Sequence, residues 1–547
     1  MHLKAARLGQ GQALSGDVCI VGAGIAGTVL AHELAQSGQS VVLLEAGGMK
    51  GAAGSLPLYR GETDDPDFHL PPDLDRARGV GGTSSMWGGR CMPFDPIDFE
   101  PRDHVPFSGW PMRYTDIEPW FRRAQDYAEC GAYDYESDAA GLKGDLVEGL
   151  KSDTLLMSSL ERWSPPTHFG KKLGRGLARS ENVTLVTGAV AVGLEAGSGA
   201  NEITRLRVRS VKSNRDFFVS AKRFVLAGGG LETTRLLLAS ARQDQAAIGD
   251  HSGWLGRGYM CHVGGVIARV VFSEGQKTVF GYEQDHDEVY VRRRFTLSDQ
   301  AQRHEKLPNM YALLDRPLLE DASHGSASLS LLFLIKRLVQ RQSADTVDTA
   351  TGTFALYKRH LRNLVLGAPE VMTVLPRFGR QRFLRGRRVP SLLLASKNNS
   401  FYLYYHAEQF PNRDSRVVLS DEADETGLAR LRIEAKLGEP DVEAIKAAHR
   451  AIDRELRASD VGRLEFLDQD VSAAIRRCKC TLGHHIGTTR MAANPAHGVV
   501  DENAKVHEMQ NLFVASSSVF PTSGQAHPTL TILAFALRLA DHLKEKT

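Results

Sequence analysis

Long apolar runs are missing from this chain of 547 residues. A helix that spans a membrane needs roughly 18 consecutive apolar residues, and the best stretch, residues 530–537, is short and interrupted by Thr531. We therefore expect no transmembrane helix. The first 16 residues contain neither the apolar core of a secretory signal nor a twin-arginine pair. Their composition predicts a cytoplasmic protein.

Cysteine is scarce, and neither sign of charge dominates. The six cysteines are scattered without paired spacing, so we expect no disulfide scaffold and infer a reducing compartment. The 67 Lys and Arg residues against 65 Asp and Glu residues give a formal charge of +2, which provides no electrostatic basis for binding nucleic acid. A composition of 42% hydrophobic and 24% charged residues is typical of a globular protein with two or three domains.

Glycine is concentrated at a turn near the N-terminus. Residues 17–28 run from an apolar strand into a glycine-rich turn and then into a helix, which is the pattern of a dinucleotide-binding fingerprint. In this pattern Gly22 allows the tight turn, Gly24 lets the backbone approach a pyrophosphate, and Gly27 lets the helix pack closely on the strand. The pyrophosphate would lie at the N-terminus of the helix.

An acidic residue follows where this fingerprint requires one. A second apolar strand, residues 40–44, ends in Glu45, and an acid about 20 residues beyond the glycines binds a ribose hydroxyl. No arginine lies near Glu45 in the sequence, which favours an unphosphorylated ribose over that of NADP. FAD and NAD both remain open at this point.

The remaining strands of this nucleotide domain are expected far along the chain, so the domain is discontinuous. Hydrophobic patterns predict strands at 182–192, 203–211 and 217–219, a strand leading into a helix at 223–240, a strand and loop at 511–524, and an amphipathic helix at 528–544. We predict an α/β fold with a Rossmann-like domain (1–110, 180–260 and 471–547), a helical connection or cap (111–179) and an inserted α+β substrate-binding domain with a mainly antiparallel sheet (261–470).

A basic stretch lies inside the inserted domain. Residues 358–388 hold nine Lys or Arg residues against the single acid Glu370. Basic runs are usually the solvated face of amphipathic helices, and we interpret this one as such a helix pair. Contact with lipid, a polyanion or a protein partner is the alternative.

A second glycine-rich segment carries a family resemblance. Residues 76–90 combine paired glycines with hydroxyl side chains, which expose hydrogen-bond donors to an anionic or planar ligand, and residues 108–111 follow as Ser-Gly-Trp-Pro. Together with the N-terminal fingerprint, this segment resembles the flavin loop of the glucose-methanol-choline (GMC) oxidoreductases, in particular their bacterial sugar- and glycoside-oxidising branch.

Ordered motifs in the C-terminal part make the resemblance more specific. They occupy residues 483–491, 498–503, 511–515, 519–522 and 527–532. The likeness covers nearly the whole chain and is weakest in the inserted domain, where only residues 408–417 look familiar. It implies FAD as the cofactor.

Oxidation of an alcohol removes a hydroxyl proton and a hydride from the same carbon, so a base must lie beside the oxygen. Histidine suits this role because it titrates near neutral pH. The resemblance implies His484 as the base and His527 as its partner, which would hydrogen-bond the substrate oxygen or share the proton. We interpret His485 as a packed neighbour and leave His262 outside the catalytic set.

The fingerprint and the resemblance together predict the cofactor contacts. They are Gly22, Gly24, Gly27, Glu45, Arg76, Gly81, Gly82, Ser84, Trp87, Val190, Ala227, Gly228, Ala515, Ser516, Pro528 and Thr529. No metal is expected, since the cysteines of residues 478–484 lack the Cys-x2-4-Cys spacing of zinc sites. The family's covalently bound members have a histidine where Met86 stands here, before Trp87, so noncovalent FAD is expected.

The resemblance implies FAD-dependent oxidation of a hydroxyl to a carbonyl on a sugar, glycoside, polyol or sugar-containing metabolite. Oxygen, a quinone or a protein carrier would re-oxidise the flavin. Three alternatives stay open: a non-redox lyase of the same fold, the flavoprotein subunit of a membrane-associated respiratory dehydrogenase, and a nucleotide-binding module without enzymatic activity.

Overall fold

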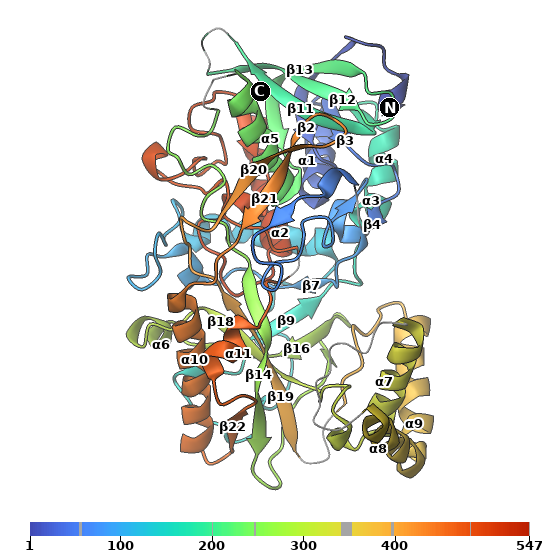
Figure 1. Cartoon of the computed structure of the whole chain (residues 1–547), viewed down its shortest axis with the longest axis vertical. Helices are drawn as coiled ribbons and strands as arrows, with labels where there is room; N and C mark the ends of the chain where they lie inside the picture. Colours follow the sequence, from blue (N-terminus) through green and yellow to red (C-terminus); the bar gives the residue numbers. More distant parts are fainter. Residues whose placement is uncertain are drawn as a thin grey trace.

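The computed structural model describes residues 1–53, 57–197, 199, 201–244, 248–340, 353–394, 399–481 and 483–545. Figure 1 shows a large sheet with helices in the upper part, where both termini lie, and a second sheet with helix α10 in the lower part. Helices α7, α8 and α9 stand together beside this second sheet. The fold is thus α/β, with a second sheet domain inserted into the first.

The upper sheet has eight strands in the order β1-β10-β3-β2-β13-β12-β11, with β23 also paired to β13. The pairs from β1 to β13, and the pair of β13 with β23, are parallel, whereas β11, β12 and β13 pair antiparallel. The strands are β1 (His2–Lys4), β2 (Ala13–Val21), β3 (Val41–Glu45), β10 (Val183–Thr187), β11 (Ala189–Ala196), β12 (Ile203–Ser210), β13 (Asp216–Leu226) and β23 (Leu512–Val514). The sheet is thus assembled from segments that lie far apart in the chain, and the domain boundaries stay a prediction.

Two strand predictions differ from the structure. The single strand predicted over 182–192 is two strands, because Gly188 takes the left-handed backbone conformation (φ 71°) and separates β10 from β11. Residues 217–219 and 223–226, predicted as separate strands, are both part of the long strand β13. The polar residues between them do not end the strand, because they continue its pairing with β2.

Helices cover this sheet where the fingerprint and the C-terminal motifs predict them. Helix α1 (Ile25–Gln36) follows the Gly22 turn, α5 (Gly229–Asp244) follows β13, and α12 (Thr529–Glu545) closes the chain, packed against α1 and α2 (Glu118–Ala128). The shorter helices α3 (Phe169–Lys172) and α4 (Gly174–Arg179) lie beside α1.

The second sheet has six strands in the order β22-β14-β19-β18-β17-β8, all paired antiparallel. They are β8 (Leu155–Leu156), β14 (His262–Phe272), β17 (Phe295–Leu297), β18 (Met310–Asp315), β19 (Ser400–Glu408) and β22 (Gly462–Phe466). Helix α10 (Glu439–Ala458) buries Val442, Ile445 and Ile452 in the same apolar core as this sheet. The predicted antiparallel sheet is confirmed.

Three small sheets complete the fold. Their orders are β15-β16-β9-β7, β20-β21-β5 and β4-β6. The strands are β4 (Ala52–Ala53), β5 (Glu62–Thr63), β6 (Ala77–Arg78), β7 (Arg90–Cys91), β9 (Leu160–Trp163), β15 (Glu283–Gln284), β16 (Tyr290–Arg293), β20 (Arg416–Ala423) and β21 (Ala429–Glu434). Two further short helices are α6 (Asp299–His304) and α11 (Val471–Arg476). Residues 111–179, predicted to be helical, therefore also supply β8 and β9 to sheets.

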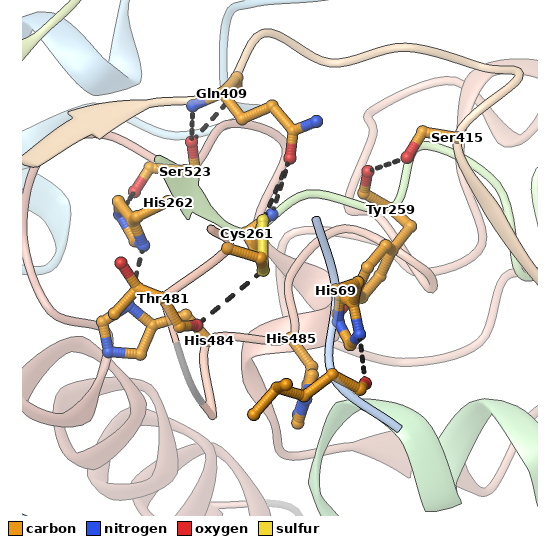
Figure 2. Close-up of a disulfide and its surroundings, with 12 residues drawn as sticks. His69, Tyr259, Cys261, His262, Gln409, Ser415, Thr481, His484, His485 and Ser523 are labelled. Carbon is orange, nitrogen blue, oxygen red and sulfur yellow. Dashed lines mark hydrogen bonds between the residues drawn. A yellow bond between two sulfur atoms is a disulfide. The ribbon is translucent and has the colours of Figure 1, made fainter. Parts of the chain in front are cut away.

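Cys261 and Cys480 form a disulfide bond, with their Cα atoms 5.8 Å apart (Figure 2). A single bond is not a disulfide scaffold, but it was not foreseen from the sequence. The spacing of the two cysteines in the sequence gave no signal, because 219 residues separate them. Backbone bridges between Val263 and Cys480 and between Met260 and Ile486 bring the two segments together. The bond also removes the Cys480 thiolate that a zinc site in residues 478–484 would need.

The structure contains no helix within the described ranges that is long and apolar enough to cross a membrane.

The close contact between Gly27 and the Gly22 turn leaves no room for a side chain at Gly27. A Cβ atom on Gly27 would overlap the carbonyl oxygen of Gly22, and neither backbone can move without shifting β2 or α1. We expect Gly27→Ala to lower the thermal unfolding midpoint by several degrees and to weaken flavin retention, as overpacking costs about 1–3 kcal/mol. Gly176→Ala in α4 is the matched control, since nothing lies within 4 Å of its added Cβ. Equal midpoints for both variants would contradict the assigned role of Gly27.

Candidate active site

A cavity opens at the carboxyl ends of the parallel strands of the upper sheet. Its wall is formed by the ends of β2, β3 and β13, the segment after β23, and the first turns of α1 and α12. This is the place where open α/β sheets bind their ligands. Thirteen of the sixteen predicted cofactor residues line it: Gly22, Gly24, Glu45, Arg76, Gly82, Trp87, Val190, Ala227, Gly228, Ala515, Ser516, Pro528 and Thr529. We call it the edge cavity.

The other three predicted residues, Gly27, Gly81 and Ser84, are not in the lining of the edge cavity. Gly27 packs against the Gly22 turn. The amide of Gly81 donates to the carbonyl of Ala23 at 2.7 Å, and the Ser84 hydroxyl donates to the carbonyl of Gly81 at 2.6 Å. These contacts hold the second glycine-rich segment against the first, so the three residues shape the cavity from behind.

Glu45 ties three loops together at the end of β3. Its carboxylate accepts hydrogen bonds from the amides of Ala23 (3.1 Å), Gly47 (2.7 Å) and Gly79 (3.0 Å). A carboxylate offers about four lone-pair positions, so it can accept a further hydrogen bond from a ribose hydroxyl at the cavity wall. The side chain is thus both a structural tie and a candidate cofactor contact.

Two buried polar groups in the lining of the edge cavity have no hydrogen-bond partner among the described residues. They are Nε and Nη1 of Arg78 and the hydroxyl of Thr233. Leaving such groups unsatisfied costs about 1–3 kcal/mol each, and a ligand rich in acceptor oxygens would satisfy them. Together with the N-terminus of α1, they fit an anionic dinucleotide such as FAD.

The prediction of cofactor contacts missed Arg78, although it stands within the motif at 76–90. Its guanidinium stacks over the Tyr59 ring at 4.3 Å, on the same ring that Arg76 contacts at 4.0 Å. Arg76 differs because it forms an ion pair with Glu232 at 2.9 Å. The sequence shows both arginines, but only the structure shows which one keeps its donors free.

Four histidines from four separate segments form a compact cluster beside the edge cavity. They come from the start of β14 (His262), from β19 (His406), from the loop after Cys480 (His484) and from the residue before Pro528 (His527). The rings of His406 and His527 stack at 4.6 Å, and the edge of His484 meets His527 at 4.7 Å. The two histidines that the sequence predicted are therefore neighbours, and His484 also lines the edge cavity.

A chain of hydrogen bonds assigns the tautomer of His484. Nε2 of His262 lies 3.1 Å from the carbonyl oxygen of Ser523, which can only accept, so this nitrogen carries the proton. Nδ1 of a neutral His262 is then an acceptor, and Nδ1 of His484, 2.9 Å away, must be the donor (Figure 2). This leaves Nε2 of His484 without a proton. His262, which the sequence analysis set aside, thus orients the predicted base.

His527 meets a different set of partners. Its Nε2 lies 3.3 Å from Nη1 of Arg90 and 3.1 Å from the hydroxyl of Tyr311. A guanidinium only donates, so Nε2 of His527 is an acceptor. Arg90 also donates to the Tyr311 hydroxyl at 2.7 Å and pairs with the fully buried carboxylate of Glu161 at 3.2 Å.

All four imidazoles of the cluster are held in the neutral form. Burial lowers the pKa of His262 to about 4. Burial, reinforced by neighbouring histidines, holds the pKa values of His406, His484 and His527 well below the ordinary value of 6.5. The cluster therefore offers proton-accepting nitrogens at neutral pH.

His485 belongs to a separate pair. Its Nε2 lies 3.2 Å from Oδ2 of Asp75, and its ring lies 6.2 Å from that of His69. Burial alone would raise the pKa of Asp75, but the charge of His485, its hydrogen bond and the nearby Arg76 outweigh burial and lower it. His485 also lines the edge cavity, next to Gly483 and His484.

Three of these histidines could in principle hold a metal ion. The candidate nitrogens of His262, His406 and His484 lie within 4.8 Å of one another. Two of the rings, however, bind each other directly through Nδ1. His262 also uses Nε2 on the carbonyl of Ser523, and His406 uses Nδ1 on the carbonyl of Gln525. The arrangement suits a hydrogen-bonded cluster, and the prediction of no metal is retained.

The neutral histidines predict a dependence of stability on pH. An unfolded imidazole binds a proton below about pH 6.5, whereas buried His262 resists protonation until about pH 4. The unfolded state therefore binds more protons, and stability falls as the pH drops from 6.5 towards 4. We expect His262→Gln to flatten this decline in the free energy of unfolding by about 1.4 kcal/mol per pH unit. Exposed His286 gives the control, His286→Gln, and an unchanged slope in His262→Gln would contradict the assignment.

Comparisons with known proteins agree with this geometry. Residues 17–307, more than half of the chain, match the family described as FAD dependent oxidoreductase, and residues 411–536 match the one described as GMC oxidoreductase. The 6'''-hydroxyparomomycin C oxidase of Streptomyces lividus is 24% identical, over 96% of this chain and 92% of the relative. The fructose dehydrogenase large subunit of Gluconobacter japonicus is 23% identical, over 97% and 98%.

The solved structure of pyridoxine 4-oxidase from Mesorbium loti shares the fold, with a TM-score of 0.53 and 17% identity over 96% of this chain and 98% of the other. Because both family models match its sequence, the chain is an FAD-dependent oxidoreductase and belongs to the GMC oxidoreductase family.

Proposed function

We propose that the protein oxidises a hydroxyl group to a carbonyl on a sugar, glycoside, polyol or sugar-containing metabolite. One observation carries the proposal: a neutral histidine, His484, has an unprotonated Nε2 and lines the same cavity as the dinucleotide fingerprint. Bound FAD supplies the hydride acceptor. The chain's own task is then to take up the hydroxyl proton and to hold the substrate oxygen.

We assign the base to His484 and the substrate-oxygen contact to His527. The guanidinium of Arg90 lies directly against Nε2 of His527, and a fixed positive charge disfavours protonation of that ring. His484 is hydrogen-bonded instead to neutral His262, which accepts from its Nδ1. Proton uptake at Nε2 of His484 would place the new charge on the ring farther from Arg90.

The substrate class is supported by the relatives. Besides the two named above, they include a paromamine 6'-oxidase of Streptomyces fradiae and a C-glycoside 3-oxidase of Arthrobacter globiformis. The first is 23% identical over 96% of this chain. By their names, these relatives act on sugars or sugar-containing compounds, and we propose the same class of substrate for this chain.

We also propose a division of labour along the chain. Residues 1–110, 180–260 and 471–547 would hold FAD, 261–470 would bind the substrate, and 111–179 would connect the two. The cofactor roles of the sixteen predicted residues belong to the same proposal, to which we add Arg78 and Thr233. The cytoplasm stays a prediction for the location, and the Cys261–Cys480 bond argues against a strongly reducing compartment.

An anaerobic absorbance titration tests the proposed function. The oxidised flavin band is followed while sugars, glycosides, aminoglycosides, polyols, sterols and simple alcohols are added in turn. Bleaching by a carbohydrate or polyol is the expected result. Bleaching only by a sterol or simple alcohol would reject the substrate class. Bound flavin that no compound bleaches would favour the lyase alternative.

The two histidines can be tested separately. We expect His484→Ala to retain flavin but to slow its anaerobic reduction by about 10²–10⁴-fold, the usual contribution of a general base. His527→Ala should also retain flavin and slow reduction, because the substrate oxygen loses its contact. His304→Ala replaces an exposed histidine at the end of α6 and serves as the control. Reduction at the wild-type rate in His484→Ala would refute its assignment as the base.

Noncovalent binding of FAD gives another test. The side chain of Met86, which stands in the flavin loop, cannot form the histidyl linkage of the covalent relatives. Trp87 beside it donates from Nε1 to the carbonyl of Thr167 at 2.9 Å. We expect acid precipitation to release all the yellow colour into the supernatant, with intact FAD on chromatography. Colour that stays with the precipitated protein would contradict noncovalent binding.

A further inference from the structure

Three helices form a separate unit beside the second sheet (Figure 1). They are α7 (Ala327–Gln340), α8 (Thr353–Leu366) and α9 (Ala368–Gly379), and α9 continues into a short π-helical segment, η7 (Arg380–Leu384). Helix α7 packs against both α8 and α9. We call this group the helical unit.

The inner side of the helical unit is well packed. Phe333 of α7 and Leu356 of α8 are buried in a small apolar cluster, and the ring of His360 stacks on Phe333 at 4.1 Å. Glu370, the only acid in the basic stretch, accepts hydrogen bonds from the hydroxyl of Ser326 (2.5 Å) and the amide of Ser328 (3.1 Å). The one negative charge of residues 358–388 is therefore turned inward.

The helical unit exposes an unusual amount of apolar surface. Nine of the sixteen large hydrophobic side chains that are exposed in the described chain fall within residues 335–384. They are Ile335, Leu338, Tyr357, Leu361, Val365, Leu366, Met372, Phe383 and Leu384. Val365, Met372 and Leu384 are 72%, 76% and 80% exposed. Scattered single residues would need no explanation, but a group of this kind marks an interaction site.

These side chains follow a helical repeat. Tyr357, Leu361 and Val365 stand four residues apart on α8, so they form one stripe along the helix. The buried residues Leu356 and His360 each precede a member of this stripe by one residue, so they lie on an adjacent side of the helix. Helix α8 thus packs Leu356 and His360 against α7, and the Tyr357 ring lies 5.9 Å from that of Phe333. Leu361 and Val365 of the stripe are 58% and 72% exposed.

Positive charge surrounds this apolar stripe. Seven basic residues of the helical unit and the segment after it are exposed: Lys358, Arg359, Arg362, Arg377, Arg380, Arg385 and Arg388. None of the seven forms an ion pair within the part of the chain that the structure describes. Two other arginines are used internally, since Arg382 donates to the carbonyl of Val389 (2.7 Å) and Arg387 to the carbonyl of Glu129 (2.8 Å). The outer face is therefore apolar and cationic, although the whole chain carries only +2.

We propose that the outer face of α8, α9 and η7 docks on the surface of an anionic lipid bilayer. An interfacial helix buries an apolar face at the headgroup boundary while Lys and Arg contact anionic headgroups. The sequence analysis interpreted the basic stretch as the solvated face of a helix pair. That interpretation explains the charged side chains but not the exposed Leu361, Val365 and Leu366. Contact with a bilayer explains both the apolar and the cationic side chains. The proposal does not depend on the proposed reaction.

The helical unit also contacts the wall of the histidine cluster. Val389, which follows it, is buried with Trp163 of β9 and Tyr290 of β16. Trp163 in turn lies 4.9 Å below the guanidinium of Arg90, which contacts His527. Docking through the helical unit would hold this side of the active site towards the bilayer.

Vesicle flotation of the flavin-loaded, full-length protein tests the proposal. Vesicles of phosphatidylcholine alone are compared with vesicles that also contain phosphatidylglycerol. We expect flotation with the anionic vesicles only, and its loss at about 1 M salt, where charges are screened within about 3 Å. Absence of flotation with anionic vesicles at low salt would overturn the proposal, as would equal flotation with both compositions.

Two sets of variants separate the apolar and charged contributions. We expect Leu361→Ser/Val365→Ser/Leu366→Ser and, independently, Arg380→Gln/Arg385→Gln/Arg388→Gln to weaken vesicle binding by at least about tenfold. The matched control is Leu156→Ser/Leu467→Ser, which changes exposed leucines (40% and 45%) outside the helical unit. Unchanged flavin absorbance and unfolding midpoint show that each variant is folded.

Wild-type binding by the triple apolar variant would overturn the proposal. The molecular mass of the same samples in solution tests whether a second copy of the chain, and not a bilayer, covers this face. If the wild type is a dimer that the apolar variant converts to a monomer, and neither binds vesicles, the face is an interface between two copies and the bilayer is excluded.

Discussion

The close approach of helix α1 to the turn at Gly22 is the constraint on which the edge cavity depends. With no side chain on Gly27, the first turn of α1 sits directly on that turn, so its amides face the ends of the parallel strands. The carboxylate of Glu45 then fixes the loops at Ala23, Gly47 and Gly79 around the same point. Backbone groups thus build an anion site, and side chains only adjust it.

The histidine cluster depends on the second sheet in an equally direct way. β14 and β19 pair so that His262 and His406 emerge on one side, with their rings 4.4 Å apart. The segment that carries His484 is attached to β14 by backbone pairing and by the Cys261–Cys480 bond. The orientation of His484 therefore follows from the sheet and from a backbone carbonyl at Ser523. Its neutral state follows from burial.

The sequence predicted the fold class and most of the edge cavity, because glycine-rich turns at strand ends have a local signature. The same logic could not find Arg78, since both arginines of the motif look equivalent until Glu232 is seen to pair with Arg76. His262, Arg90 and the disulfide were missed for another reason. Each acts through a partner more than 200 residues away, and no local pattern encodes such a pairing. The exposed stripe of α8 could not be predicted, because an apolar stripe on a helix is usually buried and only the packing of α7 to α9 shows that this one is exposed.

The parallel sheet also has a consequence for how the chain folds. Strand β2 is synthesised early, but its neighbour β13 follows only after some 200 further residues, and β23 comes near the end of the chain. Non-local parallel pairing is slow, and domains generally fold as they are synthesised. The edges of the N-terminal strands therefore stay unpaired while the following residues are synthesised. Chaperone demand and aggregation should then be highest for nascent chains that end before β13, because β2 gains its second neighbour only with that strand.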